Sequence, residues 1–265
     1  TIILGLQHTF AMFGATILVP ILTGLSIPTT LLMAGLGTLL FHLMTKGKVP
    51  AFLGSSFAFL GGYAAVAPLM EDGSPNTQML PYACGGVLCA GLLYLVLAGL
   101  IKVFGAKRVM RFFPPVVTGP IIISIGLILA PSAITNCATD WPIAITALAT
   151  VIIFNIWGRG MAKIIPILLG VAVSYAAALL TGAADLSGIG SEPVIGLPDF
   201  TLMKFDISAI ITIMPIALAT MMEHIGDISA IGATTGKNYI ADPGLHRTLL
   251  GDGLATCMAA AFGGP

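Results

Sequence analysis

Long, almost uninterrupted apolar runs are the feature that most restricts how this chain can fold. A helix that crosses a bilayer needs about 20 mostly apolar residues. Only 8% of the residues are charged and 57% are apolar, a balance that excludes an ordinary soluble domain. The sequence therefore predicts an all-helical polytopic membrane protein with about nine transmembrane helices, at residues 1–22, 26–45, 50–70, 79–101, 115–133, 142–157, 164–182, 208–235 and 248–264.

Basic residues gather on one side of the predicted membrane when successive connections are assigned alternately to its two faces. Only Lys204 falls on the opposite side, among acidic residues. The positive-inside rule makes the basic side cytoplasmic, which also places the N-terminus in the cytoplasm. Lysine plus arginine and aspartate plus glutamate are balanced at 11 each, so nothing indicates a nucleic-acid partner. The basic side holds Lys46, Lys48, Lys102, Lys107, Arg108, Arg111, Arg159, Lys163, Lys237 and Arg247.

Three ionisable residues, Glu223, His224 and Asp227, interrupt the apolar run 208–235, where hydrocarbon makes a charge costly. Glu223 lies roughly 20 Å from either end of this run, near the membrane midplane. Asp227 follows one helical turn later on the same face, whereas His224 points about 100° away. Two carboxylates in one poorly solvated site favour a bound proton, so we expect a proton-binding carrier site. The alternative is hydrogen bonding to neighbouring helices or to backbone freed by Pro215.

Residues 50–59, with the sequence PAFLGSSFAF, interrupt another apolar run with a proline, a glycine and two serines. Non-helical backbone at membrane depth is tolerated where it lines a cavity or is buried in protein, and transporters build substrate sites from such segments. The backbone N–H groups of Ser56 and Phe57 are therefore candidate donors to a substrate. The rings of Phe57 and Phe59 offer flat faces for a planar heteroaromatic ligand, although aromatic residues in a span also serve packing alone.

Other polar residues inside the runs support weaker predictions. Gln7 and His8 lie about 24 Å from the outer end of the first run, where they would orient the carboxylates or form a purely structural interhelical bond. Asp252 is expected in the first turns of the last helix, where its charge suits the positive end of the dipole. The four cysteines lack metal-ligand spacing, and no metal site is predicted: Cys84, Cys89, Cys137 and Cys257.

Several motifs, taken in chain order, resemble the nucleobase-ascorbate transporter family. They are closer to its bacterial uracil permease branch, which consists of uracil:proton symporters, than to its xanthine and uric acid branches. The motifs are Gln7-His8 followed by Ala-Met-Phe-Gly-Ala-Thr, Gly54-Ser-Ser-Phe-Ala-Phe59, Glu223-His-Ile-Gly-Asp227, Gly236-Lys-Asn238, Pro243-Gly-Leu-His-Arg-Thr and Gly263-Gly-Pro265.

The resemblance implies a fourteen-span transporter of two inverted seven-span repeats, with a discontinuous third span that carries a short extended segment. It assigns residues 1–101 (spans 1–4) and 208–265 (spans 8–9) to a core domain, and residues 114–182 (spans 5–7) to a gate domain. Residues 183–207 would form an exterior loop. We expect the chain to be truncated at both ends, and the resemblance alone implies a homodimer in a bacterial inner membrane.

The resemblance also implies roles for individual residues. Glu223 would hydrogen-bond the pyrimidine, and the backbone at Phe57, beside Ser56, would supply a second contact. Asp227 would lie close behind, at a position that varies between histidine and aspartate in the family. Supporting or proton-coupling roles would fall to Asp227, Glu223, His8, Gln7 and His224. A further glutamate motif of the family would begin just after Pro265 and is missing here.

The expected activity is therefore proton-coupled uptake of a nucleobase, most closely uracil, with a proton as coupling ion, no other cofactor and no enzymatic reaction. A purine carrier of the same family remains an alternative. A sulfate-permease-like anion transporter of the same fold would place cations or helix N-termini, rather than carboxylates, at the midplane. A membrane enzyme or channel would require a metal cluster, a nucleophile with its base, or a polar stripe along several spans, and the sequence contains none.

Overall fold

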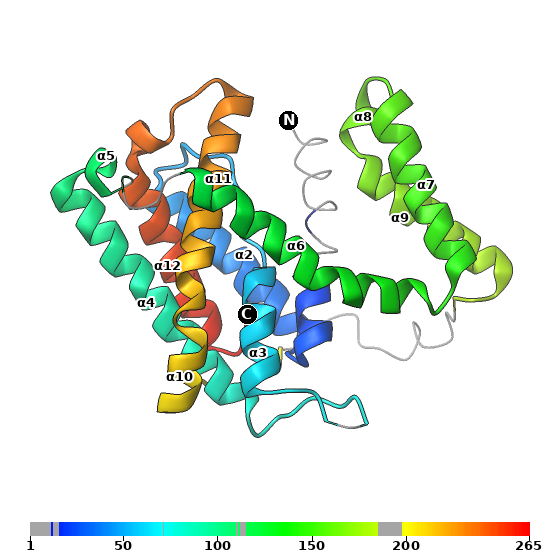
Figure 1. Cartoon of the computed structure of the whole chain (residues 1–265), viewed down its shortest axis with the longest axis horizontal. Coiled ribbons are helices and arrows are strands. Elements are labelled where there is room, and N and C mark those ends of the chain that lie inside the picture. Colours follow the sequence, from blue (N-terminus) through cyan, green and yellow to red (C-terminus); the bar gives the residue numbers. More distant parts are fainter. Residues whose placement is uncertain (1–11, 13–15, 71, 110, 112–114, 185–197) are drawn as a thin grey trace. The chain divides into compact units, whose positions relative to one another are not determined.

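The computed structural model describes residues 12, 16–70, 72–109, 111, 115–184 and 198–265, and all regular secondary structure in these ranges is helical. The chain forms two compact units (Figure 1). The larger comprises Ala15–Ile125 and Leu197–Pro265, and the smaller comprises Thr1–Gly14 and Gly126–Gly196. The helices are α2 (Ile27–Met44), η1 (Phe57–Phe59), α3 (Leu60–Val66), α4 (Leu80–Phe104), α5 (Ala106–Val109), α6 (Pro115–Cys137), α7 (Trp141–Trp157), α8 (Met161–Ile164), α9 (Pro166–Thr181), α10 (Ile207–Ile213), α11 (Ile216–Thr235), η3 (Ile240–Gly244) and α12 (Leu245–Ala261).

Three stretches of the described chain are both long and apolar enough to cross a membrane: Ile27–Met44, Leu80–Phe104 and Ile207–Thr235. Shorter apolar helices include α7 and α9. The predicted all-helical class is confirmed, and its apolar helices are those of a membrane protein. The predicted first run, 1–22, lies mostly outside the described residues.

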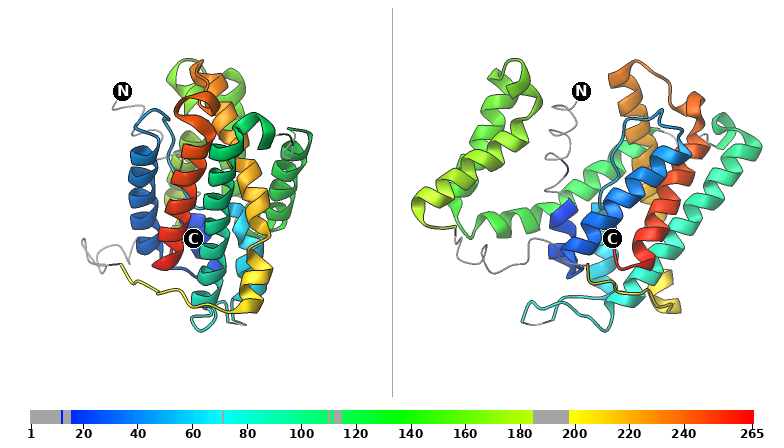
Figure 2. Two further views of the ribbon diagram at one scale, coloured as in Figure 1. Left: turned by 90° about the vertical axis from the view of Figure 1, so that its left-hand side faces the viewer. Right: turned by 180° about the vertical axis from the view of Figure 1, so that it is seen from behind.

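Helix α12 lies between α2 and α4 in the larger unit (Figure 2). Small residues permit this close approach. A Cβ atom added at Gly253 of α12 would lie 2.5 Å from the Cβ of Tyr94 of α4, and one added at Gly37 of α2 would lie 3.1 Å from the Cβ of Ala255. Because each glycine lies directly against the Cβ atom of a residue on the neighbouring helix, α12 packs closely against both α2 and α4.

The run 208–235 folds as two helices, α10 and α11, which meet at Pro215. Proline has no N–H to donate to the preceding turn, so it ends one helix and serves as the N-cap of the next. Helix α11 ends at Gly236, whose φ of +69° lies in the left-handed region that closes many helices. Glu223 therefore lies in the middle third of α11, away from both of its ends.

Contacts define two ends of the larger unit. At one end, Lys48 forms an ion pair with Asp242 at 2.6 Å, and Arg247 donates to the carbonyl of Met44 at 3.3 Å. At the other end, the backbone N–H of Lys204 donates to the carbonyl of Pro81 at 2.9 Å, next to the start of α4. Most basic residues of this unit lie in segments that begin or end at the first end: Lys46, Lys48, Lys102, Lys107, Arg108, Lys237 and Arg247.

The smaller unit is built around α7 and α9, which pack against each other. A Cβ atom added at Gly170 of α9 would lie 2.5 Å from Cγ2 of Val151 of α7, so glycine is required at this contact. Many large apolar side chains of the pair are exposed, as in a helix that faces lipid: Ile145, Leu148, Ile156, Ile167, Val171 and Leu180.

Candidate functional site

Glu223 lies half-buried on α11 and faces the start of the short helix η1. The Oγ of Ser56 is 3.5 Å from Oε2 of Glu223, at the long end of hydrogen-bonding distance. The same Oγ accepts a hydrogen bond from the N–H of Ala58 at 3.3 Å and so caps η1. Ser56 thereby connects the midpoint of α11 to the first turn of η1, which brings two of the predicted site residues together.

Residues 51–56 have no regular structure, and helix begins again at Phe57. Thr38 of α2 holds this segment, because its Oγ1 accepts from the N–H of Leu53 at 3.0 Å. Ser56 has an extended conformation, with φ −85° and ψ 125°. In extended chain, successive side chains point to opposite sides. Ser56 contacts Glu223, whereas Ser55 lines a pocket on α12, so the two serines serve different surroundings.

Phe57 is the first residue of η1 and is partly buried. The first N–H groups of a helix have no acceptor within the helix, so the backbone at Phe57 is a donor position beside Glu223. The structure thus places a carboxylate acceptor and helix-start donors at the same site. Phe59 is buried and belongs to the hydrophobic core, which favours a packing role for its ring.

His224, which is buried, and Asp252, which is partly buried, form a pair that the sequence interpretation missed. Nδ1 of His224 lies 2.8 Å from Oδ2 of Asp252, and the His224 side chain is only 7% exposed. Asp252 was expected in the first turns of its helix, with its charge placed at the positive end of the dipole; it lies beyond the first turn, where that dipole effect is small, and pairs with His224 instead. Helix α12 begins at Leu245, so Asp252 lies about two turns inside it. The only signal in the sequence was an acid inside one apolar run and a histidine inside another.

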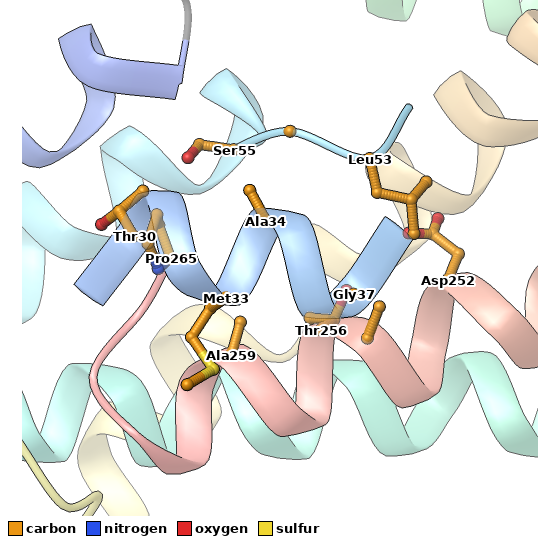
Figure 3. Close-up of a pocket in the computed structure, with 12 residues that line it drawn as sticks. Thr30, Met33, Ala34, Gly37, Leu53, Ser55, Asp252, Thr256, Ala259 and Pro265 are labelled. Carbon is orange, nitrogen blue, oxygen red and sulfur yellow. The ribbon is translucent and has the colours of Figure 1, made fainter. Parts of the chain in front are cut away.

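A small pocket lies between α2, segment 53–55 and α12 (Figure 3). Asp252 lies at one end and Pro265 at the other, with the hydroxyl side chains of Thr30, Ser55 and Thr256 along its walls. The Oγ of Ser55 is buried and makes no hydrogen bond to any described residue. The pocket is therefore polar along the side formed by the extended segment and α12.

Asp227 lies one turn beyond Glu223 on α11 and is exposed in the described part of the chain. It shares the Glu223 side of the helix, as its spacing predicts, while His224 points inward. Gln7 and His8 lie outside the described residues. No group of three or more His, Cys, Asp or Glu side chains within the described ranges is arranged to hold a metal ion.

Comparison with known proteins identifies relatives along the entire chain. The sequence matches the model of a group described as "Permease family" over residues 1–265. A "probable uracil permease" of Haemophilus influenzae is 42% identical over 270 residues, which cover 98% of this chain and 63% of that protein. The "uracil permease" of Bacillus caldolyticus is 42% identical over 280 residues, which cover 100% of this chain and 63% of that protein.

The "uracil permease" of Escherichia coli strain K12 is 38% identical over 274 residues, which cover 99% of this chain and 62% of that protein. The chain therefore spans somewhat less than two thirds of the length of these relatives. The predicted resemblance to uracil permeases is confirmed by these matches. Because the family model matches every residue from 1 to 265, the chain belongs to the Permease family.

Proposed function

We propose that the full-length protein containing this chain is a symporter that takes up uracil together with a proton. The proposal rests mainly on the position of Glu223. This residue is half-buried in the middle of α11 and lies next to Ser56 at the start of η1. A carboxylate at such a place requires a polar partner. The three relatives described above are named uracil permease or probable uracil permease, and these names support uracil as that partner.

The chemistry of the site suits a pyrimidine. Uracil carries ring N–H donors next to carbonyl acceptors. The Glu223 carboxylate accepts from an N–H group, and the backbone donors at the start of η1, at Phe57, suit a carbonyl. The ring of Phe57 offers a face for stacking. The site offers a donor, the backbone at Phe57, beside an acceptor, the Glu223 carboxylate, and this pair favours uracil over sulfate. Sulfate has only acceptor oxygens, and its negative charge would be repelled by the carboxylate.

Proton coupling follows from two carboxylates on the same side of one helix. Glu223 and Asp227 are separated by one turn, and their mutual repulsion is relieved when one carboxylate binds a proton. A proton bound from outside would therefore accompany uracil and leave with it inside. In this mechanism Glu223 contacts the substrate and Asp227 adjusts the charge of the site, with Gln7, His8 and His224 in supporting roles.

The wider architecture is part of the same proposal. Residues 1–101 and 208–265 would form the core domain of a fourteen-span inverted repeat, and residues 114–182 the gate domain. Residues 51–56 would be the break in a discontinuous third span, and 183–207 an exterior loop. The basic end of the larger unit would face the bacterial cytoplasm, and two copies would form a dimer through their gate domains.

The test uses the purified full-length protein in proteoliposomes and measures uptake of labelled uracil. Uptake should increase when an inward proton gradient is applied, and Glu223→Gln should abolish it. Asp227→Asn should retain uracil binding but lose the stimulation by the gradient. The matched control is Asp242→Asn, because Asp242 is an exposed carboxylate at the basic end, 70% exposed, and this change should leave uptake unaltered.

Four outcomes would contradict the proposal. Uptake that does not depend on the gradient would exclude proton coupling, and normal uptake by Glu223→Gln would exclude the substrate contact. Stronger competition by xanthine than by uracil would identify a purine carrier instead. Sulfate uptake without uracil uptake would identify an anion transporter.

A further inference from the structure

His224 connects α11 to three other helices at one buried point. Its imidazole packs edge-on against Phe41 of α2, with ring centroids 6.5 Å apart, and against Tyr94 of α4, at 6.4 Å. Its Nδ1 lies 2.8 Å from Asp252 of α12. Nε2 is buried without a hydrogen-bonding partner in the described ranges. Within the described ranges, the hydrogen-bonding contact of this side chain is therefore the one with Asp252.

Glu223, the preceding residue, points about 100° away around α11 and faces Ser56 of the extended segment. The two sides of the helix are thus fixed by different partners. Any rotation of α11 about its axis that disturbs His224 also moves Glu223. At about 6 Å from the axis, a rotation of about 20° displaces an atom by about 2 Å, which separates Glu223 from Ser56.

Most of the remaining inward contacts of α11 are apolar and give little control over rotation; the exception among the described residues is Thr220, whose hydroxyl shares a hydrogen bond with Tyr94 of α4. Ala217, Met221, Ile225 and Ile228 are buried against their neighbours, and apolar packing of this kind is largely non-directional. A hydrogen-bonded pair has a narrow geometry, and a buried polar pair is best attested as a device that specifies one packing register. Among the described residues, the His224–Asp252 pair is the directional contact that ties α11 to α12.

We propose that His224 is a positioning residue that acts through Asp252. The pair sets the rotation of α11 and thereby holds the Glu223 carboxylate toward Ser56 and the start of η1, where the substrate binds. This inference rests on the proposed function for its effect on uracil. The rotation itself is a property of the fold and is measurable without uracil.

The central comparison is between His224→Asn and His224→Leu in the full-length transporter. Asparagine keeps an amide N–H near the place of Nδ1–H and can still donate to Asp252, whereas leucine fills similar space without a donor. We expect His224→Asn to stay within about threefold of wild-type kcat/KM for uracil. We expect His224→Leu to lose about 10–100-fold, because a displacement of about 1 Å in a reacting or binding group has effects of this size.

Ile228→Ala is the matched packing control. Ile228 lies one turn beyond His224, is buried at 3% exposure and clusters with Phe41, but it has no polar group to bond Asp252. This variant should lower the melting temperature while the KM for uracil stays within about twofold of the wild-type value. A rise in KM equal to that of His224→Leu would reduce His224 to a packing residue and overturn the proposal.

A double-mutant cycle tests whether His224 acts through Asp252. The double variant His224→Leu, Asp252→Ala should lose no more kcat/KM than the more damaging single variant, because both changes remove the same contact. Losses that multiply would show two independent roles. Equal losses in His224→Asn and His224→Leu would also overturn the proposal, since the retained donor would then be irrelevant.

A distance measurement decides the inference even if the protein transports no uracil. Spin labels at Leu218 of α11 and Val96 of α4, 55% and 58% exposed, report the rotation of α11 by double electron–electron resonance in a cysteine-free background. The distance distribution should match wild type in His224→Asn and shift or broaden in His224→Leu. An unchanged distribution in both variants would overturn the positioning role. Absent uracil uptake in the wild type with the expected distances would instead refute only the proposed function.

Discussion

Gly253 of α12 faces Tyr94 of α4, and its replacement by alanine should destabilise the larger unit through one added methyl group. The new Cβ atom would lie 2.5 Å from the Cβ of Tyr94 and 3.0 Å from the carbonyl oxygen of Gly91. Ordinary contacts between such atoms are about 3.5–4.0 Å. The two helices would therefore have to separate locally by about 1 Å, and backbone lies on both sides of the contact, so no flexible side chain can absorb the change.

The size of the effect comes from overpacking and from the neighbouring residue. Extra methyl groups in a well-packed core cost about 1–3 kcal/mol. Asp252 directly precedes Gly253, so a shift of about 1 Å in α12 also lengthens its 2.8 Å contact with His224 beyond hydrogen-bonding range. Loss of that contact adds about 1–3 kcal/mol. We expect a total destabilisation of about 2–6 kcal/mol.

The assay is reversible unfolding in detergent, followed by circular dichroism, for Gly253→Ala and for the control Gly99→Ala. Gly99 lies on α4, the same helix as Tyr94, and a Cβ atom added there meets nothing within 4 Å. Because alanine favours a helix interior over glycine by about 0.5–1 kcal/mol, the control should be neutral or slightly stabilising. A Gly253→Ala protein as stable as Gly99→Ala would refute the close approach of α12 to α4.

Two further predictions concern the segments around the site. Thr38→Val removes the hydroxyl that accepts from the N–H of Leu53 at 3.0 Å, so hydrogen exchange at Leu53 should accelerate by about 5–30-fold, and unchanged exchange would contradict the anchoring role. In the loop after α3, hydrogen bonds from the hydroxyl and N–H of Ser74 hold the pKa of Asp72 below its usual value. Because the pKa of Asp72 is lower in the folded chain than in the unfolded chain, its ionised carboxylate stabilises the loop at pH values above the unfolded pKa. This stabilisation is lost as the pH falls through the lowered pKa of the folded chain. Protection of the Ser74 amide, measured as its exchange relative to the intrinsic rate at each pH, should therefore fall on acidification in the wild type and lose this pH dependence in Asp72→Asn; an identical profile of protection against pH in both would refute it.

The sequence was most informative where helices are long and apolar. The predicted run 26–45 became α2 and the run 79–101 became α4, with ends that moved by three residues at most. Hydrophobic periodicity and hydropathy depend only on residues close together in the sequence, so the helices that they predict do not depend on how distant segments pack. The break at Pro215 inside the run 208–235 was less visible, because the apolar composition continues on both sides of it. The inverted repeat and the division into core and gate rest on the family resemblance and stay predictions.

At the site, sequence spacing located Glu223 and placed Asp227 on the same side of α11, because both positions depend only on helix geometry. It did not connect His224 with Asp252. That contact depends on which faces of α11 and α12 meet, and this is settled by packing among α2, α4 and α12 rather than by spacing. The distinction between Ser55 and Ser56 likewise required the direction of an extended segment in three dimensions.

The glycine contacts that hold α12 against α4 and α2 also determine which parts of the larger unit can move. Helices packed closely at a glycine cannot slide along each other. A shift by one residue would replace the glycine with a larger residue, for which the contact has no space. Helices α2, α4 and α12 must therefore travel as one rigid block, carrying Phe41, Tyr94 and Asp252 with them. Segment 51–56 is joined to α2 by a different kind of contact, the hydrogen bonds between the Thr38 hydroxyl and the backbone of Leu53, and internal rearrangement of the larger unit would fall on this segment.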